Sequence, residues 1–138
     1  MPIPNYKPSG VYTGSYASAI APQSVAAAGN PTGGWVSVAM MKWAKVISIA
    51  GAGAGTVALK LEQATSSGGA GVKDLATAAA LGITVQANST EVQVDFDIPE
   101  NIDIANGFAF IRLNATVTGG SGTLYAAFLE LGPQPFEG

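Results

Sequence analysis

Apolar and polar side chains alternate in three segments of the chain. Residues 56–63 are the clearest case, because valine and leucine alternate there with alanine, lysine and glutamate. Residues 43–50 and 90–97 show the same period of two, the latter with acidic residues on its polar side. Successive side chains of a β-strand point to opposite faces of a sheet, so this pattern predicts half-buried antiparallel strands.

Four more segments have the composition of short strands. They are residues 35–38, 83–87, 108–117 and 123–131. The last two are densely apolar, which predicts central strands that are covered on both faces. The glycine-rich residues 118–122 between them predict a hairpin turn.

Small and polar residues separate the predicted strands. Residues 51–55 alternate glycine with alanine and lead into a strand pattern, so they predict a second hairpin turn. A phosphate-binding loop would instead lead into a helix. Residues 65–72 predict a long polar loop, and the Asn106-Gly107 pair is typical of a turn with positive backbone angles. Residues 74–81 fit one or two helical turns or an alanine-rich loop.

Six to eight short strands with glycine-rich turns predict an all-β protein. The expected fold is an antiparallel β-sandwich or barrel with an extended N-terminal arm, and 138 residues suffice for one such domain. The predicted organisation is an arm at residues 1–33, a β-sandwich domain at residues 34–132 and a short C-terminal tail at residues 133–138. The arm is predicted because five prolines interrupt it and no strand or helix period persists there.

The surface of the domain should carry little charge. Only 11% of the residues are charged, against about 25% in an average soluble domain. One explanation is that partners cover much of the surface in the working state, because the centres of interfaces are depleted of charge. The alternative is a surface of small residues that tolerates solvent.

The composition disfavours several classes of function. The chain has no histidine and no cysteine, its only arginine is Arg112, and its net charge is −3. A Ser-His-Asp arrangement is therefore impossible, and the usual general base and metal ligand are missing. Six basic residues are too few for the phosphate contacts that nucleic-acid binding normally needs. We expect a protein that is not an enzyme, uses no cofactor and binds no nucleic acid.

No stretch of the sequence predicts a membrane span. The longest uncharged stretch, residues 8–41, is interrupted by prolines and glycines and cannot form one apolar helix. Residues 11–16 precede an Ala-Ile-Ala sequence but make no apolar run typical of a signal peptide. We therefore expect no membrane partner and synthesis in the cytoplasm.

Four acidic residues, Asp95, Asp97, Glu100 and Asp103, lie close together in the sequence. Several carboxylates around one point are the ligands that Ca²⁺ prefers, and alternation would place the first two on one strand face about 7 Å apart. However, the glycine of a calcium loop is missing and Pro99 interrupts the series. The main interpretation is a solvated strand face with no metal, and a cation site is the alternative.

The predicted arm contains large side chains that have no core of their own. They are Tyr6, Tyr12, Tyr16 and Ile20. Aromatic anchors in an extended segment suit docking to another molecule, because each buries a large area and loses little rotamer freedom. These four residues are therefore the predicted partner-binding site.

Strand and turn motifs in residues 35–132 resemble a known group of proteins. The motifs are Trp35-Val36, Leu59-Lys60-Leu61-Glu62-Gln63-Ala64-Thr65 with Gly68, Lys73-Asp74-Leu75, Ile102-Asp103-Ile104-Ala105-Asn106-Gly107-Phe108, Phe110-Ile111-Arg112 and Leu129-Glu130-Leu131-Gly132. In this pattern the chain resembles small β-rich proteins of tailed bacteriophages, encoded near the major capsid protein, that are head decoration or auxiliary virion proteins. The likeness excludes the N-terminal arm and contains no catalytic motif.

The resemblance implies a cement function. Such a protein would bind the outside of an assembled phage capsid and stabilise the junctions between subunits, with the virion as its location after synthesis in the host cytoplasm. Its partners would be the major capsid protein and copies of itself, as a trimer or another homo-oligomer. The alternatives are another virion part, such as a tail tube or head-completion protein, or a carbohydrate- or receptor-binding β module.

Overall fold

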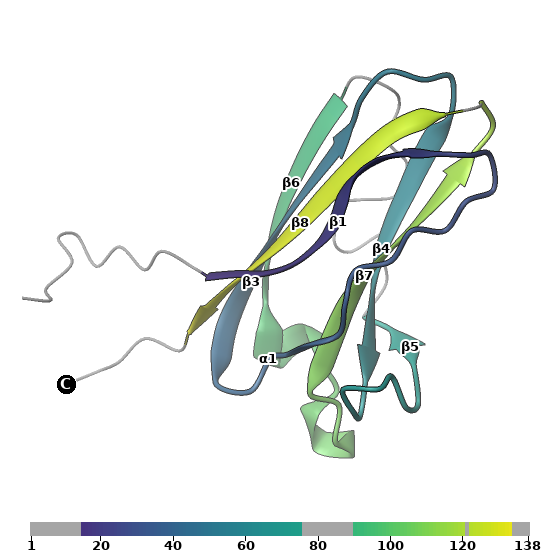
Figure 1. Ribbon diagram of the computed structural model, residues 1–138. Coiled ribbons are helices and arrows are strands. Elements are labelled where there is room, and N and C mark those ends of the chain that lie inside the picture. The colour runs from purple at the N-terminus through teal and green to yellow at the C-terminus, as the bar shows by residue number, and fades with distance from the viewer. Residues whose placement is uncertain (1–14, 76–89, 121, 134–138) are drawn as a thin grey trace, which may run out of the picture.

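In the part of the chain that the structure describes, eight β-strands form two antiparallel four-stranded sheets that face each other (Figure 1). This computed structural model describes residues 15–75, 90–120 and 122–133. The predicted all-β class, the antiparallel pairing and the number of strands are confirmed. The predicted strand at residues 83–87, most of the helical or loop segment at 74–81, and the tail beyond residue 133 lie outside the described residues.

The two sheets differ in the length of their edge strands. The first sheet has the strand order β1 (Ser15–Val25), β8 (Thr123–Pro133), β3 (Met41–Ala50) and β6 (Thr90–Asp97). The second sheet has the order β2 (Val36–Ser37), β7 (Phe110–Thr118), β4 (Thr56–Ala64) and β5 (Lys73–Asp74). The long strands β7 and β8 are central in their sheets, as their apolar content predicts.

Two short helical segments connect β6 to β7 at one end of the sandwich. They are α1 (Ile98–Asn101) and the 3-10 helix η2 (Ile104–Asn106). Asp97 caps α1 by accepting a hydrogen bond from the Glu100 backbone N–H. Gly107 ends η2 with a φ of 85°, which confirms the turn predicted from the Asn106-Gly107 pair.

The chain changes sheets at every connection between consecutive strands except β4 to β5. Both predicted hairpins are therefore wrong: residues 51–55 lead from β3 in the first sheet to β4 in the second, and residues 118–122 lead from β7 back to β8. Glycine-rich turns and alternating strands look alike in sequence whether the two strands pair or face each other. Gly53 shows the constraint on the first turn, because its φ is 142° and an added Cβ would lie 2.6 Å from the Thr123 backbone.

The boundary predicted between an arm at residues 1–33 and a sandwich at residues 34–132 is wrong. Residues 15–25 form β1, which pairs with β8 along its length. The following segment hydrogen-bonds to β7, for example from the Gly33 N–H to the Leu113 carbonyl at 2.9 Å. Short alanine and serine side chains hide the strand period of β1, and Pro22 lies at an irregularity in its pairing with β8. Residues 1–14 lie outside the described residues.

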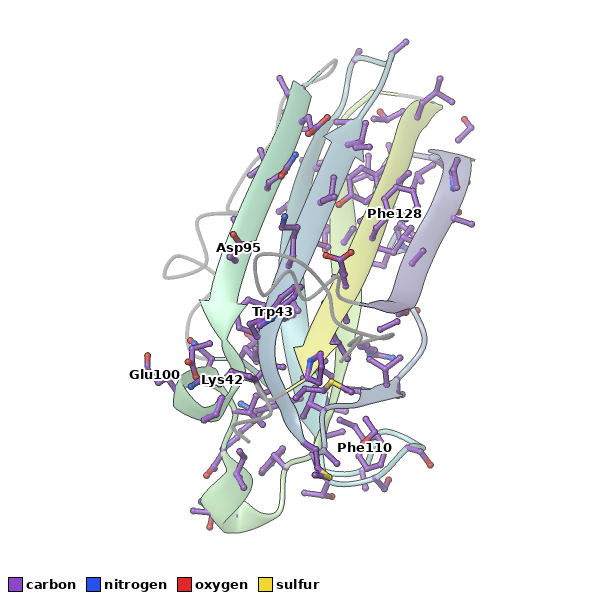
Figure 2. All side chains as sticks on the ribbon, turned by 90° about the vertical axis from the view of Figure 1, so that its left-hand side faces the viewer. Lys42, Trp43, Asp95, Glu100, Phe110 and Phe128 are labelled. Atoms are coloured by element: carbon purple, nitrogen blue, oxygen red, sulfur yellow. The ribbon has the colours of Figure 1, made fainter. Side chains whose placement is uncertain are left out.

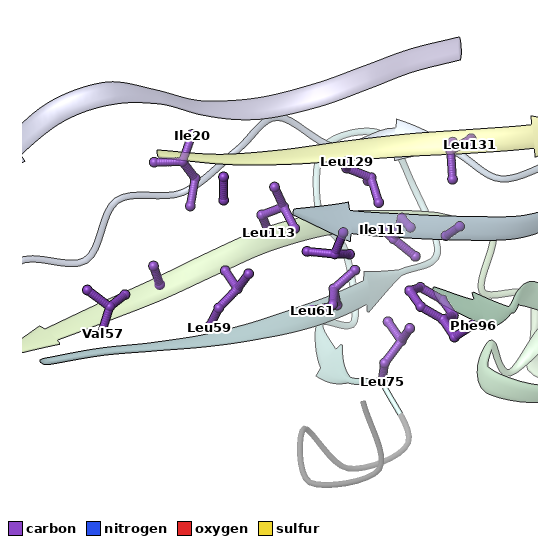
Figure 3. Close-up of a cluster of buried hydrophobic side chains, with 14 of the residues drawn as sticks. Ile20, Val57, Leu59, Leu61, Leu75, Phe96, Ile111, Leu113, Leu129 and Leu131 are labelled. Carbon is purple, nitrogen blue, oxygen red and sulfur yellow. The ribbon is translucent and has the colours of Figure 1, made fainter. Parts of the chain in front are cut away.

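The alternation of side chains gives each long strand a face toward the core and an outer face. Figure 2 shows the outer face of the first sheet, which lies in front of the second sheet. The core side chains come from both sheets and meet between them (Figure 3). Twelve large side chains are almost fully buried there: Tyr125, Ile20, Leu59, Leu61, Leu75, Ile98, Ile111, Leu113, Leu129, Val46, Val57 and Val117. Each such aliphatic or aromatic side chain contributes about 1.5–3 kcal/mol by leaving water.

One polar pair lies within this apolar core. The hydroxyl oxygens of Ser48 and Tyr125 are 2.6 Å apart and share a hydrogen bond between β3 and β8. Burial raises the pKa of the Tyr125 phenol to about 12, although the hydrogen bond to Ser48 lowers it slightly. The phenol therefore stays neutral and hydrogen-bonded, which is what a buried polar group requires.

Replacing Ile111 by alanine should lower the free energy of unfolding by about 2–5 kcal/mol, because Ile111 is fully buried and its loss leaves a cavity. Ile104→Ala is the matched control, since Ile104 is 55% exposed on η2 and its replacement should cost less than about 0.5 kcal/mol. Urea denaturation at one fixed protein concentration measures both. Equal losses in the two variants would contradict the burial described for Ile111.

Candidate functional site

The outer faces of the two sheets have opposite chemistry. On the second sheet, the outward residues of β4 and β7 are mostly polar or charged. On the first sheet, the outward residues of the central strands β3 and β8 are largely apolar. A sheet face without a core to cover it normally carries polar residues, so the first sheet is the one that needs explanation.

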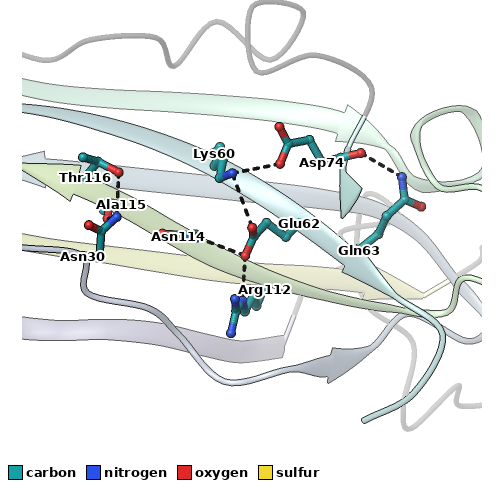
Figure 4. A network of polar contacts seen from close by, with 9 residues as sticks. All are labelled: Asn30, Lys60, Glu62, Gln63, Asp74, Arg112, Asn114, Ala115 and Thr116. Atoms are coloured by element: carbon teal, nitrogen blue, oxygen red, sulfur yellow. Dashed lines mark hydrogen bonds and ion pairs between the residues drawn. The ribbon is translucent and has the colours of Figure 1, made fainter. Parts of the chain in front are cut away.

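A polar network covers the outer face of the second sheet (Figure 4). The Glu62 carboxylate accepts hydrogen bonds from Arg112 Nε at 2.8 Å and from Asn114 Nδ2 at 3.0 Å. Lys60 Nζ lies 3.4 Å from the same carboxylate and 3.0 Å from Asp74. These contacts join β4, β7 and β5 and give the side chains partners within the sheet.

The network also sets the charge state of Glu62. Burial raises the pKa of this carboxyl, but hydrogen bonds from Arg112 and Asn114 lower it more, so the pKa lies below its ordinary value of 4.5. The Arg112 guanidinium lies over the ring of Trp35, 4.6 Å from its centroid. The outer face of the second sheet therefore meets most of its hydrogen-bonding needs through its own contacts. Among the described residues, the buried Asn114 Oδ1 in this network accepts no hydrogen bond.

The outer face of the first sheet carries an apolar stripe, which we define as Ile47, Ile49, Leu124, Ala126 and Phe128. Strand register places these side chains in adjacent rows, with Phe128 opposite Ile47 and Ala126 opposite Ile49. Leu124 is 48% exposed and Ile49 is 37% exposed. Figure 2 shows Phe128 on β8 at this face. The prediction that both faces of β8 are covered is not met by the described residues.

A hollow of about 350 Å³ lies at one end of the apolar stripe. Ile49, Leu124 and Ala126 contribute to its wall, and the end of β1 adds Pro22, Gln23 and Ser24. Ala126, which is 8% exposed, neighbours Ile49 across the strands and Leu124 along β8, and both of these larger side chains line the hollow. The hollow is mostly apolar and offers no charged group for chemistry.

Charged residues border the apolar stripe on one side. In the row next to Ile47 and Phe128, Lys45 lies opposite Glu130 on β8 and opposite Asp95 on β6. Glu91 lies opposite Ile49 on the β6 side. The face therefore has an apolar centre, a neighbouring row that contains Lys45 and Glu130, and acidic residues along β6.

The four acidic residues considered as a cation site do not come together. Asp97 binds Lys42 at 2.8 Å, and hydrogen bonding to that ammonium holds the pKa of the Asp97 carboxyl below its usual value. Asp103 binds Lys73 in the same way, with its pKa also lowered. Asp95 lies on the outer face of β6, and Glu100 on α1. Within the described part of the chain, no group of three or more acidic residues is placed to hold a metal ion.

A second hollow, of about 320 Å³, is polar and lies beside the Lys73–Asp103 pair. The Gln63 amide bridges its walls: its oxygen accepts from the Asp103 backbone N–H at 2.8 Å and its nitrogen donates to the Asp74 carbonyl at 3.1 Å. Lys73 also lies over the Phe108 ring, 4.3 Å from its centroid. These groups contact one another, and their contacts hold β5 and the segment that contains Asp103 against β4.

The four predicted partner-binding residues lie in different parts of the structure. Ile20 is 1% exposed and lies in the core, so its assignment as an anchor for a partner is wrong. The backbone of Tyr16 belongs to β1, with its Cα opposite Glu130 on the first sheet. Tyr6 and Tyr12 lie outside the described residues, and their docking role stays a prediction.

The apolar stripe is the feature that sequence analysis missed. A signal was present in β3, because alternation placed Ile47 and Ile49 on the same face as Lys45 and opposite the core residue Val46. In β8 the apolar residues are continuous, so nothing in the sequence separates the outward Phe128 from its buried neighbours.

No protein-family model matches the chain, and no curated protein matches its sequence. Among residues 15–75, 90–120 and 122–133, no helix has the length and apolar character needed to cross a membrane.

Glu62 should make stability depend on pH. Its pKa is lower in the folded state, so the carboxylate stabilises the fold above about pH 4.5, and this contribution is lost as the pH falls through the lowered pKa. Glu62→Gln should lower the free energy of unfolding by about 1–3 kcal/mol near neutral pH. The stability of this variant should also decrease less on acidification than that of the original chain. Urea denaturation at neutral and acidic pH measures both effects.

The matched control is Glu100→Gln, which removes an exposed carboxylate from α1. It should leave the pH dependence of unfolding close to that of the original chain. If Glu62→Gln and Glu100→Gln gave the same pH profile, the network around Glu62 would not be a source of stability.

Proposed function

We propose that this chain is a non-enzymatic structural protein of a bacteriophage virion, which binds the outside of the assembled capsid and stabilises its subunit junctions. The observation that supports this best is the apolar stripe on a sheet face that carries no chemical machinery. Exposed apolar patches bordered by polar residues are typical of surfaces that bind other proteins. The resemblance of residues 35–132 to head decoration proteins supplies the capsid as the partner.

The described polar groups support a structural role. The ion pairs of Glu62, Asp97 and Asp103 join neighbouring strands or hold loops against the sandwich. The buried Tyr125 phenol is held neutral and far from solvent. The partners of these groups are the Lys42 and Lys73 ammonium groups, the Arg112 guanidinium and the Ser48 hydroxyl, which hold the side chains in place and form no pair of a nucleophile with a general base.

The proposed mechanism is binding linkage. A protein that binds the assembled lattice and not the dissociated subunits stabilises the lattice by its free energy of binding. Several contacts made at once by one oligomer raise its effective affinity without requiring any single contact to be strong. The low charge of the chain fits a surface that is largely covered in the assembled state.

Purified protein mixed with undecorated capsids, assembled from the major capsid protein of the phage proposed to encode it, should appear as regular density on the outer surface in cryo-electron microscopy. The capsids should also disassemble at a higher temperature, because bound protein stabilises the lattice. A regular tube formed by the protein alone, or an absence of density on the shell, would contradict the decoration role.

The N-terminal segment supplies a test of the predicted anchors. Replacing Tyr6 and Tyr12 together by alanine should weaken capsid binding by about 10-fold or more, because each aromatic side chain is expected to bury a large area in the complex. Phe136→Ala is the control, since it removes an aromatic ring from the opposite end of the chain. Co-sedimentation with capsids measures both. Equal binding by both variants would remove the two tyrosines from the docking site.

A further inference from the structure

We propose that a second copy of this chain covers the outer face of the first sheet, so that two sandwiches pack sheet to sheet around a two-fold axis. The inference goes beyond capsid binding and does not depend on it, because it concerns the protein alone in solution. It follows from the size of the apolar face, from the way its residues match one another, and from the placement of its charges.

The face is large enough for a stable contact. Four strands about 4.8 Å apart, with side chains in rows that extend about 25 Å along the strands, give a projected area on the order of 500 Å². Two such faces packed together would bury on the order of 1,000 Å² in total, which is at the lower end of the range for biological interfaces. Figure 2 shows this face spanning β6, β3, β8 and β1.

A two-fold axis parallel to the strands, between β8 and β3, makes the face complementary to itself. Such an axis places β8 of one copy over β3 of the other, and β6 over β1. Each row of side chains then meets the same row of the second copy. Phe128 therefore lies over Ile47 of the second copy, and Ile47 over its Phe128.

The next row combines a large residue with a small one. Ile49 and Ala126 are direct neighbours across β3 and β8, so the axis places Ile49 of the second copy above Ala126. The hollow of about 350 Å³ lies at this position, with Leu124 and Pro22 in its wall. An isoleucine side chain entering from the second copy would fill part of it and bury apolar surface on both sides.

Charges match under the same operation. Lys45 and Glu130 are neighbours in one row, so Lys45 of each copy lies over Glu130 of the other. The acidic residues of β6 come to lie over β1, whose sequence SYASAIAPQSV carries no charge. An axis perpendicular to the strands would instead place β6 over β6 and bring acidic residues together, which costs free energy.

The known geometry of sheet packing is compatible with this arrangement. Sheets that pack face to face lie about 10 Å apart with their strands rotated by about 30°. The rotation displaces the outer rows but keeps the rows near the axis opposite each other. The row of Ile47 and Phe128 is central in the stripe, and the row of Lys45 and Glu130 adjoins it.

Sedimentation equilibrium of the full chain tests the proposal. At about 100 μM, above the micromolar dissociation constants of weak interfaces of this size, the mass should be twice the 13.8 kDa of one chain. Ile49→Asp should raise the dissociation constant by about 100-fold or more, because it places a charge in the apolar contact. Ile104→Asp makes the same change at a 55% exposed residue on η2 and should leave the dimer intact.

A charge exchange tests the direction of the axis and separates the interface from folding. Lys45→Glu and Glu130→Lys should each dissociate the dimer, since each places like charges opposite one another in both halves. Mixing the two variants should restore a dimer that contains one copy of each, because every facing pair is again of opposite charge. Circular dichroism should show that both single variants remain folded.

Four outcomes would overturn the proposal. They are a monomeric mass for the original chain at this concentration, a trimeric mass, equal behaviour of Ile49→Asp and Ile104→Asp, and a failure of the mixed variants to associate. A monomeric chain whose Ile49→Asp variant no longer binds capsids would assign the face to the capsid instead of a second copy. A dimer would occupy the apolar stripe, so capsid binding would then depend on the predicted anchors Tyr6 and Tyr12. The capsid experiment with those two residues replaced tests that contact separately.

Discussion

The structure depends on the burial of two inner sheet faces against each other. Because the chain crosses from one sheet to the other at almost every connection, neither sheet can form from consecutive hairpins. Every strand pair except β4–β5 joins segments that are not consecutive strands along the chain. Side chains such as Leu59, Leu113 and Leu129 therefore determine the pairing of strands that are distant in the sequence. A topology rich in such distant contacts is expected to fold slowly.

Once the inner faces are used for the core, the outer faces are free to serve different purposes. The second sheet satisfies its outer face with the network around Glu62 and the stacked pair of Arg112 and Trp35. The first sheet has no such network over its central strands, where Ile47 and Phe128 lie side by side. The two outer faces of one sandwich thus differ in chemistry: the second sheet carries paired polar groups, and the first leaves apolar side chains such as Leu124 exposed.

The sequence predicts the long alternating strands well, because side-chain burial follows a period of two in residues such as Val57, Leu59 and Leu61. It does not predict which strands pair, since the turns around Gly53 and Gly120 have the composition of hairpins but cross between sheets. β1 escapes prediction for a different reason. Its short side chains carry little hydrophobic contrast, and its place in the sheet depends on β8, which is distant in sequence.

The candidate site, too, is predictable from the sequence only where it depends on alternation within one strand. The outward position of Ile47 and Ile49 follows from alternation within β3, so half of the apolar stripe is encoded locally. Phe128, Ala126 and Leu124 join them only because β8 pairs with β3, and that pairing is not readable from a continuously apolar segment. Conversely, Ile20 looks like a free anchor until β1 is placed over the core. Surface sites formed across strands therefore need the sheet order before they can be recognised.

The position of β1 connects the two proposals. The chain enters the first sheet at Ser15, opposite Leu131, at the end of the sheet remote from the hollow beside Ile49. An axis parallel to the strands keeps this end the same in both copies, so the two N-terminal segments start from one end of the proposed dimer. If these segments carry the proposed anchors, their common side would favour simultaneous contacts with a repeating surface, and linked contacts bind far more tightly than either alone. In the dimer, each single contact with the capsid could therefore have a lower affinity while the whole still binds tightly.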